Sequence, residues 1–430
     1  MWHRLSDDSM PTDEVLGMQK FIARQPILDN RESVYGYELL FRAADEPFYR
    51  GDDQELASAS VISDSLFLYG LDELTNGARA FINCTRDTLV KGLAALLPRE
   101  RVVLEVLETI EPDDEVVAAW RSLKQDGYML ALDDFQGAKQ AVLTELADIL
   151  KVDVLATPER EQREMFQDYR PKGVVFLAEK VEKRAQFHAA VNRGYTYFQG
   201  YFFCKPEIVS AHDIAPAKLA CFRLLQAVAQ REMDLQEVEE IIKHDVAFSY
   251  KLLRYLNSAK FAFVARVISI RHAVMLLGQE ELRKWIALVS VATLGEGKPP
   301  ILVDTVLMRA AFCELLAAPL GVEKRRFEYF FLGLLSGIDA ILGRSLRDIL
   351  AEVPIAEDVR GALLGEPNPL RDVLQAVLDY EQGDWAGFSA LAKKLAVREE
   401  AFVAMYLKAL RWRRELSMEE ENQPVETLAR

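Results

Sequence analysis

The stretch VVLEVLETIEPDDEVVAAWRSLKQDGYMLALDDF (residues 102–135) decides the fold of the first half of the chain. It begins and ends with short apolar runs that are typical of buried strands. Between these runs, residues 114–125 repeat apolar side chains at helical spacing and stop two residues before Gly127, which suits a helix C-terminus. The stretch therefore predicts a strand, a helix and a second strand, which is the repeating unit of a sheet wrapped by helices.

The same alternation continues on both sides of this stretch, up to about residue 206. Helix-like stretches separate strand-like runs, and this pattern predicts a parallel sheet covered by helices. Eight such runs favour a closed (β/α)₈ barrel over an open sheet. The runs are FIARQPIL (21–28), VYGYELLF (34–41), AFINC (80–84), VVLEVLE (102–108), MLALDDF (129–135), ILKVDV (149–154), GVVFLAE (173–179) and YTYFQGYFF (195–203).

The pattern of apolar residues in the sequence changes after Pro206. Apolar residues then recur at helical spacing almost without a break, and strand-like alternation fades. We therefore predict an N-terminal extension at 1–18, a barrel at 19–206, an all-α domain at 207–410 and a polar tail at 411–430.

Composition limits the classes of function. The 430 residues are half hydrophobic and carry a formal net charge of −15, so we expect sizeable cores and no binding of polymeric nucleic acid. No long apolar run marks a signal peptide or a membrane span, and we expect a cytoplasmic protein. The cysteines are scattered, and we expect reduced thiols at Cys84, Cys204, Cys221 and Cys313.

Acidic and amide residues follow the predicted strands at their C-terminal ends. In a barrel these ends meet on one face, where chemistry is normally placed. One such acid is readily explained as a solvated loop residue or a helix cap, but a converging set needs a divalent cation to offset its repulsion. Oxygen ligands favour Mg²⁺ or Mn²⁺. The set is Glu38, Asn83, Glu105 with Glu108, Asp133 with Asp134, Lys151 with Asp153, Glu179 with Glu182, and Gln199.

Two features of this set indicate phosphodiester chemistry. Asp133 and Asp134 are adjacent, so that one can serve the barrel mouth while the other reaches a second ion. Two ions would clamp a phosphodiester and activate a water molecule. Lys151 stands between hydrophobic residues on a predicted strand, where its ammonium group could orient that water.

The ordered motifs resemble the EAL-domain family, whose members hydrolyse cyclic di-GMP to the linear dinucleotide pGpG. The resemblance covers about residues 19–206, and the signature tripeptide is Glu38-Leu39-Leu40, with Leu39 in place of the family alanine. The remaining motifs are RQPILD with Gln25, YGYELLFR with Arg42, FINCT with Asn83, LEVLET with Glu105 and Glu108, LDDF with Asp133 and Asp134, LKVD with Lys151, LAEKVE with Glu179 and Glu182, and FQGYFFCKP with Gln199.

The resemblance implies a role for each of these residues. The implied metal ligands are Glu38, Asn83, Glu105, Asp133 and, for a second ion, Asp134. The implied catalytic set is Glu179, Lys151 and Glu38, in which Glu179 is the general base and Lys151 helps to hold the attacking water. The implied ligand-binding set is Gln25, Arg42, Glu182 and Gln199. Glu108 would tether the loop that follows Asp134.

That loop departs from the family pattern. Typical members continue DDFGTGYSS, whereas this chain reads DDFQGAKQA and is a few residues shorter before Lys151. Metal and ligand binding could survive this change while turnover falls. Two alternatives to an active phosphodiesterase therefore stay open: a catalytically degenerate cyclic di-GMP receptor, and a protein-interaction scaffold. The family's dimer contact uses the same loop, so a homodimer is an expectation.

The second half resembles the HDOD family of helical domains. The resemblance lies in IIKHDVAFSYKLLRYLNSAKF and ISIRHAVMLLGQEELRKWIAL, with Asn257, Ser258 and Gly278 at recurrent family positions. A metal-dependent HD hydrolase is the alternative suggested by His244-Asp245, but the region offers few further ligands. We therefore expect a domain that binds an unidentified protein partner, in a chain without membrane segments.

Overall fold

The computed structural model describes residues 20–43, 70–107, 109–135, 141–205, 216–230, 232–243, 248 and 269–421. They form two compact units. The barrel unit holds the described residues up to Lys205 together with Leu378–Phe388, and the helical unit holds the other described residues. The predicted extension at 1–18 and the last residues of the predicted tail lie outside the described residues.

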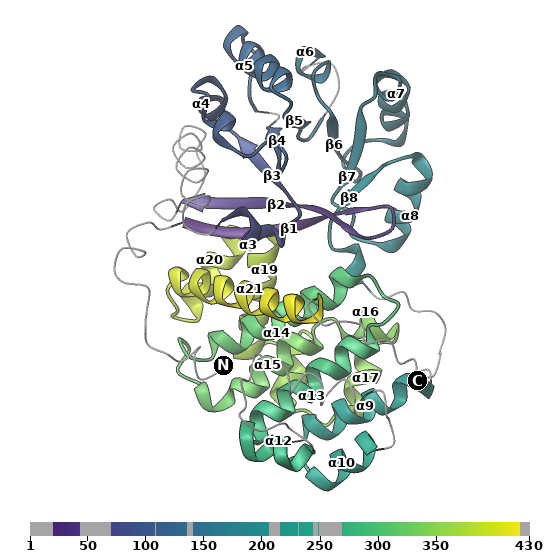
Figure 1. Cartoon of the computed structure of the whole chain (residues 1–430), viewed down its shortest axis with the longest axis vertical. Helices are drawn as coiled ribbons and strands as arrows, with labels where there is room; N and C mark the ends of the chain where they lie inside the picture. The colour runs from purple at the N-terminus through teal and green to yellow at the C-terminus, as the bar shows by residue number, and fades with distance from the viewer. Residues whose placement is uncertain are drawn as a thin grey trace, which may run out of the picture. The chain divides into compact units, whose positions relative to one another are not determined.

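Eight strands in chain order form a closed barrel (Figure 1). This confirms the barrel predicted from the sequence. The strands are β1 (Lys20–Asp29), β2 (Val34–Ala43), β3 (Arg79–Cys84), β4 (Val102–Val106), β5 (Met129–Leu132), β6 (Ile149–Asp153), β7 (Val175–Glu179) and β8 (Tyr197–Gln199).

Strand β1 runs against the direction predicted for it. It pairs antiparallel with both β2 and β8, whereas the other neighbouring strands pair in parallel. Only residues 30–33 separate β1 from β2, and a parallel crossover needs a dozen residues or more. The Asp29 carboxylate holds this turn by accepting from the backbone N–H groups of Arg31 and Ser33. The prediction of an all-parallel sheet was therefore wrong for this strand.

Helices cover the outside of the barrel (Figure 1). In α5 the residues Val116, Trp120 and Leu123 recur at helical spacing and are buried. Asp113 caps the N-terminus of α5 by accepting from the Val116 N–H group. The elements between and after the strands are α3 (Leu71–Thr75), α4 (Arg86–Val90), η1 (Leu93–Leu96), α5 (Asp114–Gln125), α6 (Ala141–Thr144), α7 (Glu159–Tyr169), η3 (Arg170–Lys172), α8 (Arg184–Arg193) and η4 (Phe202–Cys204).

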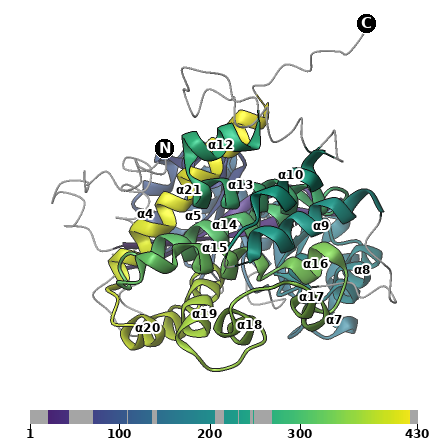
Figure 2. The ribbon, with the colours of Figure 1, turned by 90° about the horizontal axis from the view of Figure 1, so that it is seen from below.

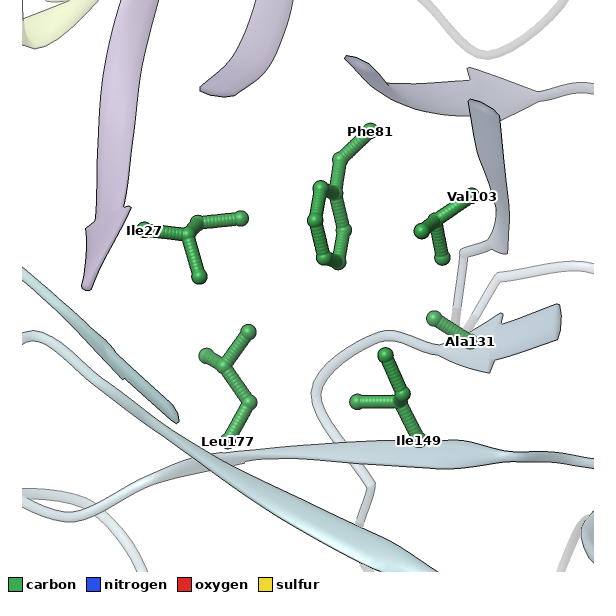
Figure 3. Packing of buried hydrophobic residues seen from close by; sticks show 6 residues of the cluster. All are labelled: Ile27, Phe81, Val103, Ala131, Ile149 and Leu177. Atoms are coloured by element: carbon green, nitrogen blue, oxygen red, sulfur yellow. The ribbon is translucent and has the colours of Figure 1, made fainter. Parts of the chain in front are cut away.

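A layer of apolar side chains fills the interior of the barrel (Figure 3). Each of six strands contributes one of these side chains, and they point toward one another. All six are buried, so this part of the barrel is a packed core rather than a pore. The layer consists of Ile27, Phe81, Val103, Ala131, Ile149 and Leu177.

The helical unit is all-α in its described residues (Figure 2), as predicted. Helix α14 is rich in apolar residues and largely buried, and it packs against α15 and α21. The helices of this unit are α9 (Pro216–Ala229), α10 (Leu235–Lys243), α12 (Ile270–Leu277), α13 (Gln279–Leu294), α14 (Pro300–Leu316), η5 (Glu323–Arg325), α15 (Arg326–Leu335), α16 (Ile338–Leu342), α17 (Leu346–Glu352), α18 (Glu357–Leu363), α19 (Pro369–Gln382), α20 (Trp385–Lys394) and α21 (Glu399–Glu421). The end of α19 and the start of α20 belong to the barrel unit.

The core of the helical unit contains a buried ion pair. Lys284 on α13 and Glu314 on α14 are almost fully buried and form a salt bridge, and Arg326 on α15 lies 3.3 Å from the same Glu314 oxygen. Burial raises the pKa of Glu314, and the Lys284 ammonium group opposes this rise. These charges tie three core helices together.

Two further expectations concern the whole chain. The structure joins none of the four cysteines in a disulfide, and Cys84, Cys221 and Cys313 are buried. None of the helices in the described ranges has the length and apolar character needed to span a bilayer.

Candidate metal and nucleotide site at the barrel mouth

The site lies two residues further along the strands than the apolar layer. Side chains two residues apart on a strand share a face. Moving two residues forward from Phe81, Val103, Ala131, Ile149 and Leu177 therefore leads to a second inward-facing layer. That layer consists of Asn83, Glu105, Asp133, Lys151 and Glu179. The alternation that packs the core thus also places the polar residues above it.

Lys151 lies at the centre of this second layer. Its side chain is 1% exposed, and its Nζ atom is 2.8 Å from Asp133 Oδ1 and 3.1 Å from both Glu105 Oε2 and Glu179 Oε1. Glu38 from β2 completes the group, with Oε2 at 3.2 Å. We call the four carboxylates around Lys151 the acidic cluster. The structure thus brings together five of the residues predicted from strand ends.

The acidic cluster carries more negative charge than Lys151 balances. An ammonium group has three N–H donors, so four carboxylates cannot all accept from it in good geometry. Asp133 Oδ1 forms an ion pair with Lys151 but no hydrogen bond. The cluster therefore holds four acids against one cation.

Burial and this crowding shift the pKa values of the cluster. Burial raises the pKa of Glu179 to about 8, with Lys151 opposing the rise and neighbouring acids adding to it. Burial also raises the pKa of Glu105 well above its usual range, again against the pull of Lys151. Burial alone would lower the pKa of Lys151, but the surrounding carboxylates outweigh it and the pKa lies well above its ordinary value. The arrangement favours an added positive charge.

Amide side chains connect Glu38 to the rest of the mouth. Asn83 Nδ2 donates to Glu38 Oε1 at 3.0 Å, and Gln199 Nε2 donates to Glu38 Oε2 at 2.7 Å. Gln199 Nε2 also lies 3.0 Å from Gln25 Oε1 on the antiparallel strand β1. Gln25 and Gln199 are therefore joined to the acidic cluster through Glu38.

Besides Asp133 Oδ1, which has only its ion pair with Lys151, three buried oxygens at the mouth have no hydrogen-bond partner among the described residues. They are Asn83 Oδ1, Glu105 Oε1 and Gln199 Oε1. Buried acceptor oxygens normally have a hydrogen-bond partner. Carboxylate and amide oxygens are also ligands that suit a hard divalent cation. The donor chemistry therefore fits Mg²⁺ or Mn²⁺.

The same residues do not form a ready-made metal cage. Within the described residues, no three His, Cys, Asp or Glu side chains are arranged to hold an ion. The reason is visible in the acidic cluster, whose carboxylates converge on the Lys151 ammonium group rather than on an open point. Binding of an ion therefore requires these carboxylates to turn partly away from Lys151.

A second group of charges lies beside the acidic cluster. Asp134 follows Asp133 with a positive φ of 40°, and burial and then Asp133 raise its pKa. Lys180 follows Glu179 with a positive φ of 55°, and its ammonium group is 2.7 Å from Asp153 Oδ2. Such strained backbone collects at functional sites. Sequence reasoning missed Lys180, since the backbone conformation that marks it is not visible in the sequence.

The remaining predicted site residues lie apart from the acidic cluster or outside the description. Arg42 is buried, and its Nη1 atom is 3.4 Å from the Trp385 carbonyl oxygen. The Glu182 side chain is exposed, and its backbone N–H donates to Gln186. Glu108 and residues 136–140 of the altered loop lie outside the described residues.

The predicted features of the helical half are described only in part. Gly278 joins α12 to α13 with a positive φ of 81°. Asp304, one of the isolated acids considered for an HD hydrolase site, is 3.1 Å from Arg413 Nε. His244, Asp245, Asn257 and Ser258 lie outside the described residues.

Comparison with known families and relatives identifies both halves. The EAL domain family matches residues 83–206, and the HDOD domain family matches residues 216–351. The uncharacterized protein YuxH of Bacillus subtilis is 36% identical over 404 residues, which cover 92% of this chain and 98% of that protein. The cyclic di-GMP phosphodiesterase CdgJ of Vibrio cholerae is 34% identical over 402 residues, which cover 92% of this chain and 93% of that protein.

Solved structures resemble only part of the chain. A manganese/cy-diGMP complex of Klebsiella pneumoniae BlrP1 is 24% identical with a TM-score of 0.36, and the match covers 44% of this chain and 56% of that one. The assignment therefore depends on the family matches and the two sequence relatives. The chain belongs to the EAL–HDOD family, together with relatives that align with it along almost their whole length.

Proposed function

We propose that the barrel unit hydrolyses cyclic di-GMP to pGpG with a divalent cation, Mg²⁺ or Mn²⁺, bound beside the acidic cluster. The observation that carries this proposal is the convergence of four carboxylates and three unpartnered oxygens at the C-terminal ends of the strands. A relative that shares nearly the whole chain is named a cyclic di-GMP phosphodiesterase, which supports the choice of substrate.

The charge balance explains why a cation is needed. With all four acids ionised, the acidic cluster exceeds the charge of Lys151, and a phosphodiester would bring further negative charge. A bound divalent cation would offset this charge and polarise the phosphodiester. We assign its ligands to Glu38, Asn83, Glu105 and Asp133, and we assign Asp134 to a second ion.

The chain's own residues would handle the water and the nucleotide. Glu179 would take a proton from the attacking water, and Lys151 would hold that water in position. The water oxygen bonds to phosphorus, one P–O3′ bond breaks, and the departing 3′-oxygen takes up a proton. Gln25 and Arg42 would contact the nucleotide, with Gln199 orienting Gln25 through the bond at 3.0 Å. Glu182 remains a predicted contact of a ligand at the rim.

One observation favours a second candidate, a receptor that binds cyclic di-GMP without hydrolysing it. Lys151 occupies the point on which the carboxylates converge, and no ready-made metal cage exists among the described residues. If the ammonium group holds this place against the ion, the nucleotide binds while water is not activated.

One assay separates the two candidates. Purified full-length protein is incubated with cyclic di-GMP and Mg²⁺ or Mn²⁺, and pGpG is measured by chromatography. We expect pGpG to form with metal, to disappear in EDTA and to be lost in Glu179→Gln. Asp148→Asn is the matched control, since Asp148 is a barrel acid that pairs with Lys124. Ligand binding without pGpG in either metal would establish the receptor instead.

We also propose boundaries and partners for the two domains. The barrel domain spans 19–206 and the HDOD-type domain spans 207–410 apart from Leu378–Phe388, which belong to the barrel unit, and the two domains are flanked by the extension at 1–18 and the tail at 411–430. The helical domain would bind an unidentified protein, and the whole chain would form a homodimer. Gel filtration with light scattering tests the dimer, which a monomeric mass would exclude.

A further inference from the structure

A short turn from a distant part of the sequence contacts the two residues assigned to the nucleotide. Residues 382–385 join α19 to α20 and belong to the same compact unit as the strands. Gln25 Nε2 donates to the Gln382 carbonyl oxygen at 2.6 Å, and Arg42 Nη1 lies 3.4 Å from the Trp385 carbonyl oxygen. The turn therefore contacts the two side chains that the proposed function assigns to ligand binding.

Two tyrosines hold this turn in place. Tyr201, just after β8, donates to the Glu381 carbonyl oxygen at 2.8 Å. Tyr380 is fully buried and donates to the Ile22 carbonyl oxygen at 2.9 Å. The Tyr380 ring also meets the rings of Trp385 and Phe388 edge to face. The position of the turn is thus fixed by hydrogen bonds and packing on both sides.

Gly383 lets the turn approach β2 closely. Its φ is 70°, in the left-handed region that favours glycine. A β-carbon there would lie 2.6 Å from Leu40 Cδ1. Leu40 is the third residue of the signature tripeptide that begins with Glu38, so the turn packs directly on the strand that supplies a cluster carboxylate.

The Gln25 amide links the turn to the acidic cluster. Its nitrogen donates to Gln382, and its oxygen accepts from Gln199, which also donates to Glu38. Both polar atoms of the Gln25 side chain therefore have partners inside the unit. A nucleotide that binds the Gln25 amide nitrogen competes with the Gln382 carbonyl oxygen for it.

We propose that the turn at residues 382–385 is an internal gate over the nucleotide site and that this structure shows it closed. This inference rests on the proposed function. The cyclic dinucleotide binds Gln25 and Arg42 after the turn releases them, so the turn and the ligand compete for the same donors. Any event that draws this segment away from β1 and β2 raises the affinity for the ligand.

Loosening the turn tests the gate. The variants are Tyr201→Phe with Tyr380→Phe, which removes two anchoring hydroxyls, and separately Gly383→Ala, which crowds Leu40. Full-length protein carrying Glu179→Gln, to block turnover, is titrated with cyclic di-GMP by calorimetry. One net hydrogen bond is worth about fivefold in affinity, and we expect both variants to bind at least that much more tightly than the parent. Gly173→Ala is the control, since Gly173 shares a positive φ but has open space around it.

Hydrogen exchange gives an independent measurement. The Asp384 N–H donates to the Asp379 carbonyl oxygen and the Trp385 N–H to that of Gly383, so these amides are protected as long as the turn keeps this conformation. We expect cyclic di-GMP to speed their exchange in the parent protein. Slower or unchanged exchange, or equal affinity in parent and variants, would show that the turn is no gate while leaving the proposed function intact. Failure of the parent and every loosened variant to bind cyclic di-GMP would overturn the proposed function and the gate together.

Discussion

At the scale of single residues, Lys151 sets the charge balance of the barrel mouth. It is buried against four carboxylates, so Lys151→Met removes the cation that they share. Breaking a buried ion pair costs about 3–5 kcal/mol, and we expect a loss of that order in the free energy of unfolding at pH 8. Urea unfolding in EDTA measures it, and added Mn²⁺ should restore part of the loss.

The control for this prediction is Lys124→Met. Lys124 pairs with Asp148 on the same barrel, but both side chains are about a third exposed. Pairs in solvent contribute about 0–1 kcal/mol, so the control should be nearly neutral. Equal losses in both variants would mean that Lys151 does not hold the acidic cluster together.

Glu179 gives the apo protein a specific pH dependence. Its pKa is raised to about 8 in the folded chain from an ordinary 4.5. As the pH rises from about 4.5 to about 8, the unfolded chain loses a proton that the folded chain keeps. The contribution of Glu179 to stability is therefore full below pH 4.5 and is lost as the pH approaches 8.

Urea unfolding in EDTA at several pH values checks this sign. We expect the stability of the wild type to fall more steeply between pH 5 and pH 8 than that of Glu179→Gln. Glu111→Gln, which changes an exposed acid before α5, should follow the wild type. A Glu179→Gln profile as steep as the wild type would contradict the raised pKa.

At the scale of strands and helices, the sequence carries much of the barrel and of its site. Alternation along β3 to β7 places apolar residues in one layer and polar residues two positions later. Once these strands are located in the sequence, Asn83, Glu105, Lys151 and Glu179 are located as well. Strand ends alone were enough to predict that these side chains meet.

Other features depend on contacts that no local pattern records. The antiparallel direction of β1 follows from the four-residue turn after it. The alternation of strands and helices in the sequence does not take the length of that turn into account. Lys180 is marked only by its backbone conformation. Gln25 and Gln382 are 357 positions apart, and no periodicity in either segment indicates that they touch. The central place of Lys151 among the acids also required coordinates.

The end of β8 offers a prediction about one such contact. Gly200 follows Gln199 with a φ of 139°, and a β-carbon there would lie 2.1 Å from the Val181 carbonyl oxygen. The Val181 N–H donates to the Gln199 carbonyl oxygen, so the two loops cannot separate freely. We expect Gly200→Ala to cost about 2–4 kcal/mol of stability through backbone strain and overpacking.

Gly173→Ala tests strain without crowding, because nothing lies within 4 Å of a β-carbon there. It should cost about 1–2 kcal/mol, the ordinary penalty of a left-handed residue. Urea unfolding compares the two variants. A Gly200→Ala loss no larger than that of the control would show that the loops yield at this point.

At the scale of the whole molecule, two compact units carry separate buried charge groups. The acidic cluster belongs to the barrel unit, and the pair of Lys284 with Glu314 belongs to the helical unit. Proteins with more than one unit often unfold in more than one step. A ligand stabilises only the unit that binds it, so the two groups can be perturbed independently.

Calorimetry of the full chain measures this independence. We expect Mn²⁺ to raise the midpoint of one thermal transition and to leave the other in place. Lys284→Met leaves Glu314 buried without its main partner, which should cost about 3–5 kcal/mol in the helical unit. This loss should lower only the transition that Mn²⁺ leaves in place. Lys151→Met is the reciprocal control, in which only the transition that Mn²⁺ raises should move. A single transition that both variants and Mn²⁺ shift together would mean that the units unfold as one, because a shared transition responds to a perturbation in either part.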